Sequence, residues 1–124
     1  MTIKVEKAML RNLEQIRAKN ALAASGRIAR TVAKNVPSMV IANGFIGALA
    51  FAIEKKEDYL LAFQAVIDHL HKARLNCGIA ATDPQAFLDE LCAKSADTLR
   101  AITDESMAYL NYLRRFAKPD KEDK

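Results

Sequence analysis

The stretch NVPSMVIANGFIGALAF, from Asn35 to Phe51, contains no charged residue, and the uncharged run continues to Ile53. A membrane-spanning helix needs about 20 predominantly apolar residues, so length alone would permit a span. Polar or helix-breaking residues interrupt the run, and its Asn-Gly pair favours a turn. These interruptions are Asn35, Pro37, Ser38, Asn43, Gly44 and Gly47. We therefore interpret the stretch as a central core helix, apolar all round because its neighbours wrap it.

That interpretation makes further predictions about the same stretch. Gly44 and Gly47 would let another helix approach closely. Asn43 would be buried, and would then need a hydrogen-bonding partner. The residue before a proline avoids the α region, so Val36 is expected to end one helix and Pro37 to begin the next.

The composition predicts an all-α protein. The 124 residues suffice for one domain, and 51% of them are hydrophobic and 27% charged. Four glycines and three prolines leave few turns, and the 6% aromatic content includes no tryptophan. Residues 1–118 are expected to form the helical domain, and the charged segment PDKEDK, residues 119–124, a flexible tail.

Apolar periodicity and capping residues predict further helices around the core helix. We expect helices over residues 2–24, 37–55, 57–72 and 95–118, and a short one that begins at Asp83-Pro84. Ser25-Gly26 either stops or bends the first helix. Two sets of residues are expected to face inward. In 57–72 these are Leu60, Leu61, Ala65, Val66 and Leu70, and in the last helix Leu99, Ile102, Ser106, Leu110, Leu113 and Ala117.

Positive charge is concentrated at the start of the chain. The first 34 residues hold eight lysines and arginines against two glutamates, whereas the whole chain has a net charge of +4. Three basic ridges stand out, and such a distribution is compatible with nucleic acid or an acidic partner. A solvated helix face would look the same. The ridges are Lys4, Lys7 and Arg11; Arg27, Arg30 and Lys34; and Arg114, Arg115 and Lys118.

The sequence offers little that resembles a catalytic or metal-binding site. His69 and His71 are two apart on a helix, so their side chains diverge and we interpret them as ordinary surface residues. The adjacent carboxylates of Asp104 and Glu105 would point to different faces and make a poor acid–base pair. We predict a protein without enzymatic activity, cofactor or metal. With two isolated cysteines and no signal peptide, we expect it in the cytoplasm.

Two segments together resemble a known family. VPSMVIANGFIGALAF, from Val36 to Phe51, and SMAYLNYLRRFA, from Ser106 to Ala117, resemble motifs of the small α-helical subunit of type III-B CRISPR effector complexes, also called the Cmr or RAMP-module complexes. A basic first helix before the proline also fits. The resemblance extends from about Ala8 to Lys118. One departure is Tyr112, where relatives often carry tryptophan.

The resemblance implies a compact, single-domain bundle of five or six helices without catalytic activity. Copies of it would form the minor filament of an RNA-guided antiviral complex, beside the major-filament and other subunits. Self-association of the isolated protein stays open. The subunit would support the path of the target RNA along the guide RNA through basic side chains. The candidates here are Lys7, Arg11, Arg17, Arg27, Arg30 and Lys34, followed by Arg114 and Arg115. Pro37, Asn43, Gly44 and Phe51 would be structural.

Two other classes of protein compete with this interpretation. The first is a small helical adaptor whose basic face binds an acidic protein, which treatment with RNase during purification would distinguish. The second is a helical DNA-binding regulator. The sequence disfavours it, because an apolar core helix, and no polar recognition helix, follows Ser25-Gly26.

Overall fold

The computed structural model describes the backbone of residues 2–55 and 57–119, and the side chains of 12–55 and 57–119. This part of the chain contains five helices and no strand, so the predicted all-α class is confirmed. The helices are α1 (Thr2–Ser25), α2 (Arg30–Lys55), α3 (Glu57–Lys72), α4 (Pro84–Cys92) and α5 (Ala96–Phe116). Of the predicted tail, all but Pro119 lies outside the described residues.

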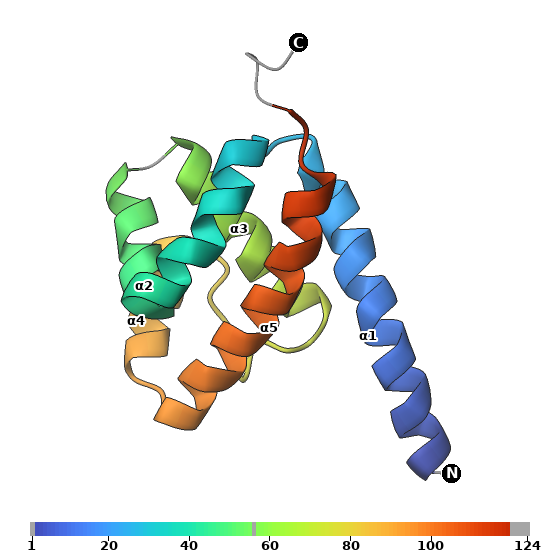
Figure 1. The fold of residues 1–124 in the computed structure, drawn as a ribbon. Coiled ribbons are helices and arrows are strands. Elements are labelled where there is room, and N and C mark those ends of the chain that lie inside the picture. Colours follow the sequence, from blue (N-terminus) through green and yellow to red (C-terminus); the bar gives the residue numbers. More distant parts are fainter. Residues whose placement is uncertain (1, 56, 120–124) are drawn as a thin grey trace.

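The helices form one bundle in which α5 lies between α1 and α2 (Figure 1). Helix α2 packs against α3, α4 and α5, whereas α1 packs against α3 and α5. The N-terminal half of α1 extends away from the other helices (Figure 1). The core contains Phe45, Phe63, Phe87 and Tyr109, all 2% exposed or less. The rings of Phe45 and Phe63 meet edge to face, with centroids 5.6 Å apart.

Helix α2 contributes one side to the core. It is not buried all round, contrary to the prediction from the sequence. It is the helix in the described part that is long and apolar enough to cross a membrane. Eight of its residues are buried against the neighbouring helices. Its outer side is open to solvent, with Ile41 77% exposed and Phe51 at the rim. Phe51 packs edge-on against Tyr59 of α3, with ring centroids 5.6 Å apart. The core-helix interpretation therefore holds for one side of α2.

The predicted helix boundary at Pro37 is wrong, because α2 continues through this residue. The interruption lies instead at Gly44, whose φ of 79° and ψ of 162° are not helical. Proline costs a helix one hydrogen bond but keeps a helical φ, so it need not end the helix. The backbone angles of Gly44 are accessible essentially to glycine alone. Helix α2 thus consists of two helical pieces joined at Asn43-Gly44.

Asn43, Gly44 and Gly47 are exposed, contrary to the prediction of a buried asparagine and a close helix contact. A Cβ atom added at Gly44 would meet no atom within 4 Å, and one at Gly47 would meet only the Cβ of Asn43, at 3.3 Å. No neighbouring helix therefore requires a small residue here. What favours glycine at position 44 is its positive φ of 79°.

The remaining elements follow their sequence signals closely. Helix α3 has the predicted bounds, although Leu61 is 44% exposed and does not face inward. The Asp83 side chain caps α4, accepting a hydrogen bond from the amide of Ala86 at 3.2 Å, and Ser95 caps α5 in the same manner. The last helix is unbroken, as predicted. The chain turns between Ser25 and Arg30, so Ser25-Gly26 ends α1 rather than bending it.

Candidate nucleic-acid interface

Two of the three basic ridges lie together at one end of the bundle. The backbone N–H of Arg30 donates to the carbonyl oxygen of Lys118 at 3.0 Å, within an isolated parallel β-bridge between Ala29 and Lys118. The Arg30 guanidinium donates to the carbonyl oxygen of Ala117 from Nε and Nη2, at 3.3 and 3.2 Å. These contacts hold the start of α2 against the end of α5. They bring ridges that lie at least 80 residues apart in sequence to the same end.

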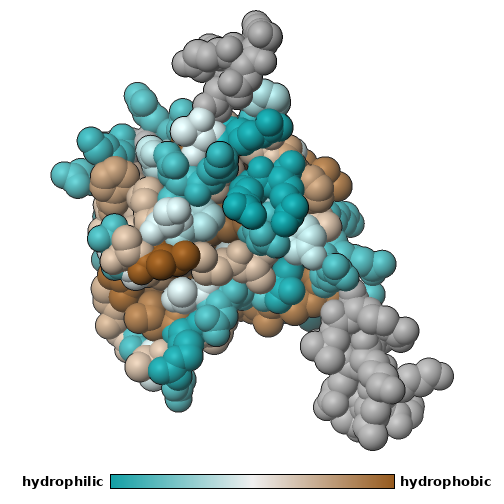
Figure 2. All heavy atoms as spheres, viewed as in Figure 1, coloured by the Kyte–Doolittle hydropathy of each residue, from teal (hydrophilic) through white to brown (hydrophobic). Residues whose placement is uncertain are grey.

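The cations at this end reach solvent. Arg27, Arg30, Lys34, Arg114 and Arg115 are all exposed. Figure 2 shows hydrophilic side chains over the upper part of the molecule, where the start of α2 and the end of α5 lie. We call this group of five side chains the basic end.

The first ridge lies elsewhere. Lys7 and Arg11, like Lys4, belong to the half of α1 that runs away from the basic end (Figure 1). Their side chains lie outside the described residues. Their predicted contact with RNA therefore stays a prediction, resting on sequence alone.

Arg17 points into the bundle. Its Nε donates to Oε2 of Glu105 at 2.8 Å and its Nη2 donates to Oε1 at 2.6 Å, which makes a bidentate pair between α1 and α5. Only 24% of its side chain is accessible. The hydrogen bonds to Glu105 raise the pKa of Arg17 further above its ordinary value. Among the candidate RNA-binding residues whose side chains are described, Arg17 is the one that forms an ion pair with a buried carboxylate.

Glu105 is buried, with 8% of the residue exposed, and it joins three helices. Besides the Arg17 pair, its Oε2 lies 2.9 Å from Nε2 of His69 on α3. Burial opposes ionisation of the carboxyl group. The hydrogen bonds from Arg17 and His69 outweigh that effect and hold the pKa of Glu105 below its ordinary value.

His69 is a buried residue, which corrects its interpretation as a surface histidine. It is 1% exposed and stacks on the ring of Tyr109, with centroids 4.3 Å apart. Its Nδ1 lies 2.9 Å from Nδ2 of the Asn20 side-chain amide. With that amide donating, Nδ1 accepts and Nε2 carries the proton given to Glu105. The sequence did hold a signal for this burial, because His69 lies one turn after Ala65, which was predicted to face inward.

His71 diverges from His69, as the spacing predicted. Its Nε2 lies 2.8 Å from the carbonyl oxygen of Ala81 in the loop before α4. Among the described residues, no three histidine, cysteine, aspartate or glutamate side chains lie close enough to hold a metal ion.

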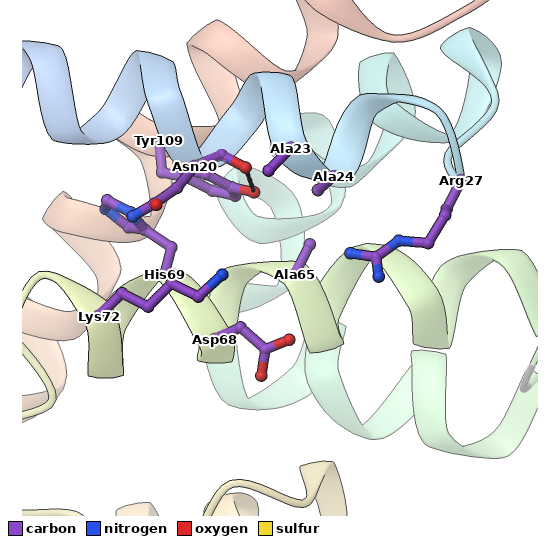
Figure 3. Close-up of a pocket in the computed structure, with 9 residues that line it drawn as sticks. All are labelled: Asn20, Ala23, Ala24, Arg27, Ala65, Asp68, His69, Lys72 and Tyr109. Carbon is purple, nitrogen blue, oxygen red and sulfur yellow. Dashed lines mark hydrogen bonds between the residues drawn. The ribbon is translucent and has the colours of Figure 1, made fainter.

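A groove between α1 and α3 was not foreseen from the sequence. It has a volume of about 420 Å³ and is lined by Ile16, Lys19, Asn20, Ala23 and Lys72. We call it the α1–α3 groove. A smaller hollow of about 20 Å³ adjoins it, since Asn20, Ala23 and Lys72 line both. In Figure 3, Arg27 reaches over this hollow from the turn after α1, while Lys72 reaches toward the same space from α3.

The fold and these surfaces define a class: a small all-α protein with exposed basic side chains at one end, and no metal-binding cluster among its described residues. The model of the family described as CRISPR-associated protein (Cas_Cmr5) matches residues 6–119. The chain therefore belongs to the Cas_Cmr5 family, which confirms the resemblance inferred from its two motifs. Comparisons with curated proteins and with solved structures gave no match.

Proposed function

We propose that the protein is a non-catalytic small subunit of a cytoplasmic type III-B CRISPR effector complex. Copies of it form the minor filament, next to the major-filament subunits. The basic surface of the subunit supports the target RNA along the guide RNA. Membership of the Cas_Cmr5 family supports the assignment to a CRISPR effector.

The observation that carries the RNA contact is the junction of two basic ridges at the basic end. The β-bridge between Ala29 and Lys118 places the cations of the α2 start beside those of the α5 end. Phosphate backbones require cations at approximate spacing and no particular base contacts. Guide–target pairing would supply the sequence specificity, while the protein contacts backbone and shape.

Arg27 and Lys34 are the best residues with which to test this function. Both are exposed, whereas Arg30 also holds Ala117 and its loss would disturb the fold. We expect Arg27→Glu combined with Lys34→Glu to weaken target-RNA binding of the reconstituted complex by about tenfold or more at low salt. The measurement is a binding titration of the complete complex, with the variant as its small subunit.

The matched control is Lys55→Glu combined with Lys94→Glu. It changes the net charge by the same amount at two exposed lysines outside the basic end. Equal target affinity for the two double variants would contradict the proposed function. If an acidic protein co-purifies with this protein after RNase treatment, and no guide RNA does, the adaptor interpretation would be favoured.

A further inference from the structure

We infer that the α1–α3 groove is a binding site for a phosphodiester of single-stranded RNA, distinct from the basic end except that Arg27 borders both. The inference rests on the proposed RNA contact and gives it a second, specific location. Four features of the groove lead to it: its charge, its apolar wall, its size, and the way in which its polar side chains are held.

The charge of the groove is one-sided. Its polar lining consists of two lysines and one asparagine, without a carboxylate. Lys19 and Lys72 come from different helices, and both are exposed. No carboxylate of a described residue lies within ion-pair distance of either lysine. An anion that enters between the two helices would therefore meet two cations without a counter-ion among those residues.

The adjoining hollow adds a third cation and one carboxylate. Arg27 and Lys72 approach the hollow from opposite ends (Figure 3). Asp68 also lines it, and its Oδ1 accepts a hydrogen bond from Gln64, one turn earlier on α3, at 3.0 Å. The cations thus outnumber the carboxylate. The hollow, at about 20 Å³, holds no more than a water molecule. A ligand must therefore lie in the larger groove, with Arg27 at its edge.

The remaining lining of the groove is apolar. Ile16 and Ala23 lie on α1, on either side of the Lys19-Asn20 pair. A nucleotide presents a charged phosphate next to a weakly polar sugar and base. Lysines can contact the phosphate while the apolar wall contacts the sugar and base, which lysines alone could not do. The volume of about 420 Å³ lies within the range of pockets that hold small ligands.

The asparagine side chain that lines the groove is held in place by the core. The amide nitrogen of Asn20 lies 2.9 Å from Nδ1 of the buried His69, which in turn contacts Glu105. The backbone carbonyl oxygen of Asn20 also accepts a hydrogen bond from Tyr109 at 3.5 Å. The network therefore positions α1 against α3 at the groove. Lys19 and Lys72 would make the contact with the phosphodiester.

The test is a titration of the full-length, ¹⁵N-labelled protein with hexauridylate, followed by backbone amide shifts. We expect the largest shifts at residues 16–23 and around Lys72. Lys19→Gln combined with Lys72→Gln should weaken binding at least about tenfold at about 50 mM salt. It should also reduce the slope of log K against log salt by about 0.7 for each phosphate that the variant no longer neutralises. Lys55→Gln combined with Lys94→Gln, which removes the same charge elsewhere, should leave the affinity unchanged.

Each alternative result overturns the inference. Shifts confined to residues 27–34 and 114–118 would place RNA at the basic end only and leave the proposed function intact. Inorganic phosphate that binds as tightly as hexauridylate at matched ionic strength would indicate a small-anion site. Equal weakening by both glutamine pairs would indicate a diffuse charge effect. Loss of target affinity with the basic-end variant, but not with the groove variant, would retain the function and exclude the groove.

Discussion

At the scale of single residues, Glu105 is the side chain whose role the sequence most concealed. From the sequence, Asp104 and Glu105 were expected only to point to different faces of a helix. Glu105 is the one that is buried, and it accepts hydrogen bonds from α1 and α3. A buried charge is tolerated only when it is paired and hydrogen-bonded, and Arg17 and His69 satisfy that requirement. The pair therefore ties α1, the most projecting helix, to the core.

We expect Glu105→Gln to reduce the free energy of unfolding by about 2–4 kcal/mol, because it leaves Arg17 half-buried without its counter-ion. Urea unfolding followed by circular dichroism measures the change. Asp104→Asn is the matched control, since it makes the same chemical change at an exposed neighbour. Similar losses for both variants would show that the buried network contributes little.

The same carboxylate predicts a pH dependence. The pKa of Glu105 is lower in the folded protein than the value of about 4.3 expected in the unfolded chain. The unfolded state therefore binds the proton more readily, and the stabilisation is present above the unfolded pKa. It disappears as the pH falls through the folded value. We expect the difference in unfolding free energy between wild type and Glu105→Gln to shrink as the pH falls below about 4.3, the value in the unfolded chain. A constant difference would contradict the lowered pKa.

At the scale of elements, α2 shows how two strong local signals can be ranked wrongly. Pro37 looked like the stronger helix boundary, whereas the interruption occurs at Gly44. Both residues permit a break, but neither requires one. The packing of Val36 and Val40 before the break, and of Phe45 and Leu49 after it, favours a chain that changes direction at Gly44.

We expect Gly44→Ala to destabilise the protein by about 1–3 kcal/mol, because a φ of 79° with a ψ of 162° is strained for any residue with a Cβ atom. Thermal unfolding measures the loss. Gly26→Ala is the control. Its added Cβ also meets no atom within 4 Å, and its φ lies outside the left-handed region. That variant should change stability by less than about 1 kcal/mol. Equal effects would show that Gly44 tolerates a helical conformation.

At the scale of the whole molecule, the two residues that follow α5 fasten it to the start of α2. Ala117 is 1% exposed, and its carbonyl oxygen and that of Lys118 accept the hydrogen bonds from Arg30. These contacts join the α1–α2 turn to the end of α5. The basic end therefore depends on a contact between residues almost 90 apart in sequence.

Truncation after Phe116 should destabilise the protein by about 2 kcal/mol or more, because it removes a buried side chain and leaves the donors of Arg30 without acceptors. Truncation after Pro119 keeps these contacts and should leave the melting temperature unchanged. The comparison is made by thermal unfolding of both truncated chains beside the full one. Equal melting temperatures for all three would contradict a structural role for Ala117 and Lys118.

Much of the architecture could be predicted from the sequence because its signals are local. The Asp83-Pro84 and Ser95 caps, the periodicity of α5, and the apolar run of α2 act over a few residues, so they predict helices and most of their bounds. The two motifs likewise sufficed to indicate the family that the match over residues 6–119 shows.

The roles of the charged residues depended on the tertiary structure. Lys19 and Lys72 line one groove, Arg17 pairs with Glu105, and His69 is buried. A helix face reveals which side chains lie together within one helix. Which face meets which neighbour depends on packing between segments about 50 to 90 residues apart, to which periodicity is blind. The sequence by itself thus determined the helices, most of their bounds and the family, and only the packing decided which cations stay free to meet a ligand.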